Sequence, residues 1–124
     1  MTREDAKLVL KDLCARLSYG IKIQVPYEDG SGYFDETVWE VNNEGPFYVN
    51  GWGIEYEYVK PYLFPLSSMT EEQKQEYQYI TERWMHDSSY SISDSIDWLN
   101  AHHFDYRGLI EKSLAIDATK LNVY

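Results

Sequence analysis

The sequence is short of positive charge, and the shortage is concentrated in one stretch. No lysine or arginine occurs between Lys22 and Lys60, although the 124 residues include 11 of them. The same stretch holds eight of the 21 acidic residues, so it accounts for most of the net charge of −10. Nucleic acid and anionic lipid are both bound through clustered cations. The sequence therefore predicts neither direct nucleic acid binding nor membrane binding.

Cysteine and long hydrophobic runs are also scarce. The single cysteine, Cys14, excludes an internal disulfide framework and is typical of a reducing compartment. No stretch reaches the roughly 18 apolar residues that a membrane-spanning helix requires, and no apolar secretory signal follows Met1. We therefore expect a cytoplasmic protein. With 44% hydrophobic residues, the chain is expected to form a single domain, residues 1–124, around its own core.

The first twenty residues carry the pattern of a helix. Thr2 can cap its start, and acidic residues follow in the first turn, where the positive end of the helix dipole favours them. Apolar residues then recur every three or four positions: Ala6, Leu10, Leu13, Cys14 and Leu17. This spacing predicts one buried stripe, and Gly20 is a natural end for the helix.

The middle of the chain predicts β-strands. Apolar and polar residues alternate over 21–26, and a second alternating run covers 33–41, with Trp39 on the same face as Thr37 and Val41. The pair Asn50-Gly51 predicts a tight hairpin, because both residues tolerate positive φ angles. A further strand is possible over 60–64, where Pro61 is expected to restrict it to an edge or a bend.

Helical patterns return after Pro65. The first helix can start with a capping box formed by Ser68 and Glu71 or by Thr70 and Gln73, and its buried stripe is expected to hold Tyr77, Ile80 and Trp84. A polar break is expected over 87–91. A short helix should bury Ile92, Ile96 and Leu99, and Asp105 should cap a last helix with Tyr106, Leu109, Ile110 and Leu114 on one face.

These patterns together predict an α+β fold. We expect a small antiparallel β-meander of about four strands, with the N-terminal helix and the C-terminal helices packed on one face of it.

Three phrases of the sequence carry a family resemblance: residues 13–17, 60–70 and 97–110. Together they resemble a group of short acidic proteins from gut anaerobes, their prophages and mobile elements. The resemblance implies an intracellular, phage-related setting. It supplies no catalytic residues, because the group has no assigned activity.

The residues that most resemble a metal site are His102, His103 and Asp105, since imidazole and carboxylate groups suit zinc or a non-haem metal. Adjacent histidines on a helix point about 100° apart, however, and the usual helical pair is four residues apart. The alternative is that one histidine caps the end of the short helix and Asp105 caps the next one. We favour this alternative and expect no metal and no cofactor.

Catalytic interpretations have equally little support. Cys14 lies on the expected apolar stripe, where a free cysteine is normally inert, and no serine lies in a Gly-x-Ser-x-Gly motif. The carboxylates of Glu55 and Glu57, next to Tyr56 and Tyr58, could act on or bind a glycan. The same residues equally fit the solvated face of a strand.

The remaining interpretation is a binding surface on the acidic, aromatic part of the sheet. Tyrosine and tryptophan dominate interface hot spots, and acidic residues around them would steer a basic partner. The residues chosen for this surface are Trp39, Glu40, Trp52, Glu55, Tyr56, Glu57 and Tyr58.

We therefore expect a non-enzymatic interaction protein of phage or mobile-element type that binds a basic protein surface. The alternatives are a small metal-dependent or glycan-acting protein and a homo-oligomeric structural protein that self-associates without a ligand.

Overall fold

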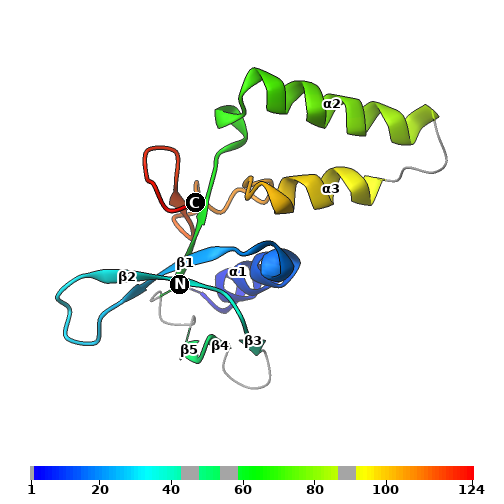
Figure 1. Cartoon of the computed structure of the whole chain (residues 1–124). Coiled ribbons are helices and arrows are strands. Elements are labelled where there is room, and N and C mark those ends of the chain that lie inside the picture. The colour runs from blue at the N-terminus through cyan, green and yellow to red at the C-terminus, as the bar shows by residue number, and fades with distance from the viewer. Residues whose placement is uncertain (1, 43–47, 54–58, 87–91) are drawn as a thin grey trace.

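A computed structural model describes residues 2–42, 48–53, 59–86 and 92–124, and it confirms the α+β class (Figure 1). The helices are α1 (Arg3–Arg16), α2 (Glu71–His86) and α3 (Ile92–Ala101), with short 3₁₀ turns at Leu17–Tyr19 and Leu66–Ser68. The strands are β1 (Lys22–Pro26), β2 (Tyr33–Thr37), β3 (Val41–Asn42), β4 (Tyr48–Val49), β5 (Trp52–Gly53), β6 (Lys60–Leu63) and β7 (Ile116–Asp117).

The strands of these residues form two small sheets, where the sequence predicted one meander. The larger sheet has the order β2-β1-β6-β7, and the smaller one has the order β3-β4-β5. All pairs are antiparallel except β6 and β7, which run parallel because α2 and α3 lie between them in the chain. The expected strand over 33–41 ends at Thr37, and β3 already belongs to the second sheet.

Pro61 lies in an interior strand of the larger sheet, where the sequence predicted an edge or a bend. The carbonyl of Leu63 accepts a hydrogen bond from the N–H of Ala118 at 2.9 Å. The backbone N–H and C=O groups of alternate residues of β6, Pro61 among them, therefore point toward β7. The pairing with β7 begins only at Tyr62. The N–H that proline lacks would therefore have had no partner in the ladder, and the sheet tolerates the residue.

The side chain of Tyr124 completes the ladder between β1 and β6. The register of these strands places Lys22 opposite Tyr62. The two residues share the Tyr124 hydroxyl, which accepts from the Lys22 N–H and donates to the Tyr62 carbonyl, each at 2.9 Å. The tyrosine thus satisfies two backbone groups that the strands alone leave apart.

Helix α1 covers the core side of the strands, and its N-terminal half follows the prediction. Thr2 and Asp5 form a reciprocal capping box, and Gly20 ends the following turn with a φ of 69°. The predicted stripe is only partly right. Ala6, Val9, Leu10 and Leu13 are buried, whereas Cys14 and Leu17 are exposed, because Asp12 and Arg16 occupy that side of the core instead.

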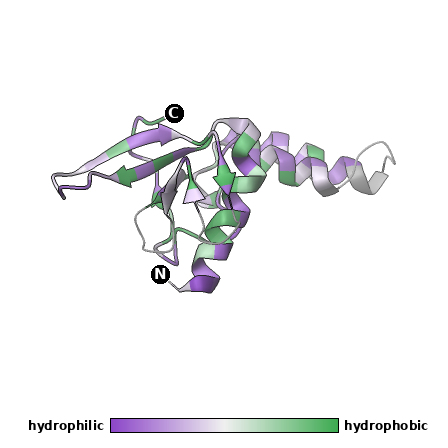
Figure 2. Cartoon of the chain, turned by 90° about the horizontal axis from the view of Figure 1, so that it is seen from below, coloured by the Kyte–Doolittle hydropathy of each residue, from purple (hydrophilic) through white to green (hydrophobic). Residues whose placement is uncertain are grey.

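Helices α2 and α3 form an antiparallel arm that extends away from the sheets, opposite to the β1–β2 hairpin (Figures 1 and 2). Of the two capping boxes predicted for α2, the structure forms the one between Thr70 and Gln73. Near the base of the arm, Tyr77 and Ile80 pack against a cluster of Trp98, Leu99 and Phe104. Ile96, expected in the core, is exposed, and the predicted break over 87–91 and the side chain of Trp84 lie outside the described parts.

The last predicted helix is wrong. After Asp105 the chain makes a series of turns and then enters β7. The Asp105 carboxylate nevertheless has a capping role, since it accepts hydrogen bonds from the N–H groups of Leu109 and Ile110, both at 2.9 Å. Leu109 and Leu114 are buried in the main core, as the apolar pattern requires. None of the helices in the described parts of the chain has the length and apolar character needed to cross a bilayer.

Candidate functional site

The free end of the β1–β2 hairpin carries aromatic side chains on its core-facing side. Val25 is paired with Phe34, and Tyr27 continues the alternation of β1 beyond the strand, so all three lie on one face. Val25 is fully buried, Phe34 is half-buried and Tyr27 is 49% exposed. The ring centres of Tyr27 and Phe34 are 5.1 Å apart. The apolar face of the hairpin therefore extends from the core out to solvent.

Trp52 of β5 packs against this aromatic group. Its ring lies edge-on to Phe34 at 5.7 Å, and its indole N–H donates to the carboxylate of Glu36 at 2.7 Å. A hollow of about 460 Å³ opens between the hairpin and β5, lined by Val25, Pro26, Tyr27, Glu28, Gly30, Trp52 and Gly53. A second hollow of about 380 Å³ lies along the same rings, next to Asp29 and Phe34. Both volumes are in the range of small-ligand pockets.

The rim of the hollow is acidic. Glu28 and Asp29 are exposed at the tip of the hairpin, and Glu36 stands beside Trp52. Hydrogen bonds from the side chain and the N–H of Ser31 hold the pKa of Asp29 below its ordinary value, so this carboxylate stays ionised. On the opposite face of the hairpin, the Lys22 ammonium donates to the Val123 carbonyl at 2.6 Å. No cation within this sequence block offsets the acids. We call Tyr27, Phe34, Trp52, Glu28 and Asp29 the hairpin site.

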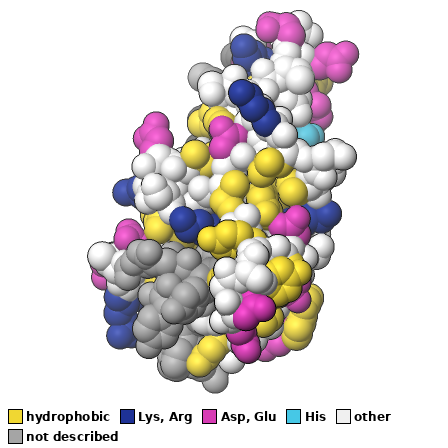
Figure 3. Space-filling view, turned by 90° about the vertical axis from the view of Figure 1, so that its left-hand side faces the viewer, with side chains coloured by type: hydrophobic (Ala, Val, Ile, Leu, Met, Phe, Trp, Pro, Cys, Tyr) yellow, Lys and Arg dark blue, Asp and Glu magenta, His cyan; other side chains and the backbone are white. Residues whose placement is uncertain are grey.

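Figure 3 views the molecule from the side toward which the β1–β2 hairpin extends. Hydrophobic side chains, in yellow, lie directly beside acidic ones, in magenta, on this face. Exposed apolar groups with a polar rim are typical of interaction sites.

The sequence prediction selected only part of this site. Of the residues chosen from the sequence, Trp52 lies in it. Trp39 and Glu40 lie outside it, on the connection between β2 and β3, where Trp39 is 66% exposed. The side chain of Asn50 fixes this connection by accepting from the N–H groups of both residues, at 2.8 and 3.1 Å. Glu55, Tyr56, Glu57 and Tyr58 lie outside the described residues.

Tyr27, Phe34, Glu28 and Asp29 were not among the predicted binding residues. The signal that could have found them is the hairpin itself. A turn centred on Gly30 pairs Val25 with Phe34, and alternation then places Tyr27 beside Phe34.

The weak metal candidates are not brought together. The Nδ1 atom of His102 lies 2.9 Å from the Trp98 carbonyl, which makes this histidine a cap for the end of α3, as the alternative interpretation predicted. His103 has a φ of 60° and stacks on Tyr124 with 4.2 Å between ring centres, while Asp105 is bound to backbone N–H groups. Over the described part of the chain, no group of three His, Cys, Asp or Glu residues is placed to hold a metal ion.

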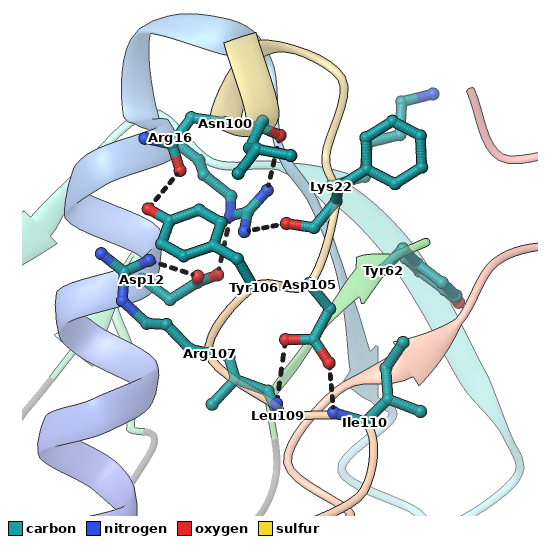
Figure 4. Close-up of polar contacts among 12 residues, drawn as sticks. Asp12, Arg16, Lys22, Tyr62, Asn100, Asp105, Tyr106, Arg107, Leu109 and Ile110 are labelled. Carbon is teal, nitrogen blue, oxygen red and sulfur yellow. Dashed lines mark hydrogen bonds and ion pairs between the residues drawn. The ribbon is translucent and has the colours of Figure 1, made fainter. Parts of the chain in front are cut away.

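The most extensive polar cluster of the described residues is structural (Figure 4). Arg16, fully buried, donates to Asp12 at 3.0 Å and to the carbonyls of Leu99 and Phe104 at 3.4 and 2.6 Å. Arg107 donates to the other oxygen of Asp12 at 2.7 Å. The buried carboxylate thus meets two guanidinium groups, which is how a buried charge is tolerated. The cluster ties α1 to the end of α3 and leaves no group aimed at a ligand.

The hairpin site can bind but shows no catalytic arrangement in its described residues. Aromatic faces attract cations, and the carboxylates at the rim add a favourable field and hydrogen-bond acceptors. The exposed Cys14 is on α1, and His103 is packed against Tyr124, so neither reaches the site. Comparison of the chain with protein-family models, with curated proteins and with solved structures finds no match.

Proposed function

We propose that this chain is a non-enzymatic interaction protein that binds a basic protein partner at the hairpin site. The observation that carries the proposal is the hollow of about 460 Å³ between the hairpin tip and β5, with aromatic walls and acidic rim. A lysine or arginine side chain matches both the aromatic walls and the acidic rim, because its aliphatic stem packs on the rings while its charged end meets the carboxylates. The resemblance to phage and mobile-element proteins supports a partner inside the host cell, in the cytoplasm.

The charge of the site favours fast and salt-sensitive association. The hairpin belongs to the sequence block without lysine or arginine, and the β2 residues Asp35 and Glu36 add their charge to that of Glu28 and Asp29. Such a field attracts a basic partner over about one Debye length and raises the association rate. Glu40 and the exposed Trp39 belong to the same block and are proposed as peripheral contacts.

The test is a pair of variants with the same change in net charge. The double substitution Glu28→Lys, Asp29→Lys reverses the charge of the hairpin tip. The control, Glu71→Lys, Glu72→Lys, reverses two exposed charges in the first turn of α2, on the arm. Proteins captured by the parent chain from a host extract are purified, and their association rates with all three chains are measured.

We expect the tip variant to associate at least about tenfold more slowly, with a flatter dependence on salt, while the control stays close to the parent. A second substitution, Tyr27→Ala, should speed dissociation, because it removes one wall of the hollow. Equal slowing by the tip and arm variants would show that only net charge matters. Such a result would refute the hairpin site.

A further inference from the structure

The hairpin site has an open sheet edge beside it, and this edge indicates how a partner would bind. β2 is an outer strand of the larger sheet. Hydrogen bonds at both ends of the hairpin give its backbone pattern: the Val38 N–H donates to the Ile21 carbonyl, and the Tyr27 N–H donates to the Gly32 carbonyl, both at 2.9 Å. In an antiparallel ladder such bonded pairs alternate with pairs whose N–H and C=O groups point outward.

This alternation places Phe34 and Glu36 in bonded pairs with β1 and turns the backbones of Tyr33, Asp35 and Thr37 outward. The Thr37 carbonyl confirms the direction, because it accepts from the Asn50 side chain at 2.9 Å. No other hydrogen bond from the described residues reaches the outward backbone groups of Tyr33 or Asp35. Both residues are exposed, and within the described ranges the outward N–H and C=O groups of each have no hydrogen-bond partner.

A strand added to this edge would place alternate side chains on the face of the hairpin site. Phe34 and Glu36 point to that face, where they contact Trp52. The neighbouring residues of an added strand would therefore lie against Trp52 and near the acidic tip, and the intervening ones would lie beside Tyr33 and Asp35. The Asp35 carboxylate accepts from the Tyr62 hydroxyl at 2.5 Å, so each face of the edge has a carboxyl group, Asp35 on one side and Glu36 on the other.

We propose that the partner contributes an extended basic segment that pairs with β2 as an additional strand. Its lysine or arginine residues occur at every second position and enter the hairpin site from the edge. Backbone hydrogen bonds to Tyr33 and Asp35 set the register, and the acidic rim selects the charge. Charge complementarity identifies the occupant, because a second copy of this chain would bring another acidic, lysine-free strand to the same edge. This inference rests on the proposed function and specifies its geometry.

The test uses a synthetic peptide in which lysine alternates with threonine, and a matched peptide in which the backbone nitrogens of one register are methylated. Binding is measured by titration, and amide hydrogen exchange of the protein is followed residue by residue. In the free protein, the Tyr33 and Asp35 amides should exchange quickly, while those of Phe34 and Glu36 are protected by β1. On binding, the Tyr33 and Asp35 amides should become protected too, and methylation should weaken binding by roughly tenfold.

The possible failures are distinct. If the peptide binds, and the Glu28→Lys, Asp29→Lys variant loses binding, but the two amides stay unprotected, strand addition is refuted while the proposed function stands. If neither peptide binds the parent chain, strand addition by a basic segment is refuted, and the proposed function is decided by the charge-reversal variants and captured proteins described above. If the two amides become protected at high protein concentration without peptide, the edge is a self-association surface and the inference is wrong.

Discussion

At the scale of single residues, the fold resists the protonation of His103. The residue is 8% exposed, and its ring is stacked on Tyr124. Burial, together with the charges of Arg16 and His102, lowers its pKa from 6.5 to about 4. The folded state therefore needs a neutral imidazole, whereas the unfolded chain protonates near its ordinary pKa.

This difference predicts an acid-sensitive stability. Below pH 6.5 the unfolded state binds a proton that the folded state excludes, so stability contributed by neutral His103 is present above pH 6.5 and is lost as pH falls toward 4. Between pH 7 and pH 4 the free energy of unfolding should fall by about 2 kcal/mol less in His103→Asn than in the parent chain, since asparagine tolerates the positive φ but does not titrate. Urea unfolding of both chains at pH 7 and pH 4 measures it. Parallel pH profiles would contradict the assignment.

Residue patterns alone could not identify the buried ion pairs. Helical spacing correctly placed Ala6, Leu10 and Leu13 in the core, but it put Cys14 there in place of Arg16. A polar residue on a helix is normally assigned to solvent. Here Arg16 is buried because its partners include carbonyls 83 and 88 residues away, and no local pattern reports contacts at that separation.

At the scale of elements, local signals were reliable wherever neighbouring residues decide the outcome. The capping residues of α1 and α2 and the Asn50-Gly51 turn, with φ angles of 50° and 83°, follow from short-range chemistry. The segment after Asp105 has a helical pattern yet forms turns, because the following residues pair with β6. Strand order likewise depends on distant pairing, so the sequence predicted the class and missed the second sheet.

The Tyr124 side chain completes the ladder between β1 and β6, and its contribution is testable. Tyr124→Phe keeps the ring over His103 but leaves the Lys22 N–H and the Tyr62 carbonyl without the bridging hydroxyl. Because the bridge lies at the protein surface, its loss should lower the free energy of unfolding by about 0.5–1.5 kcal/mol, the net value of an ordinary hydrogen bond. Tyr33→Phe is the control, since that side chain is 63% exposed. Thermal or urea unfolding that gave the same value for both variants would show that the bridge contributes nothing.

At the scale of the whole molecule, charge is distributed unevenly, and the imbalance should affect stability as well as binding. A net charge of −10 repels itself in the compact state, most strongly around the block between Lys22 and Lys60. Raising the salt concentration from about 0.01 M to about 0.15 M shortens the Debye length from about 30 Å to about 8 Å.

We therefore expect the parent chain to become harder to unfold as sodium chloride is added over that range. This gain in the free energy of unfolding with salt should be smaller in the Glu28→Lys, Asp29→Lys variant than in the Glu71→Lys, Glu72→Lys variant. Both change the net charge equally, but only the first acts inside the acidic block. Chemical unfolding at the two salt concentrations provides the measurement. Stability that falls with salt would show that attractive ion pairs outweigh the repulsion.

The helical arm leaves the sheet and returns to it at the same place. Phe64 bridges to Phe104 through two backbone hydrogen bonds of 2.9 Å. The Phe64 N–H donates to the His103 carbonyl, and the Asp105 N–H donates to the Phe64 carbonyl. These bonds hold together the two ends of the segment that contains α2 and α3. The entropic cost of bringing its ends together grows only with the logarithm of the segment's length. The strands can thus keep their pairing even if α2 and α3 are lengthened or shortened.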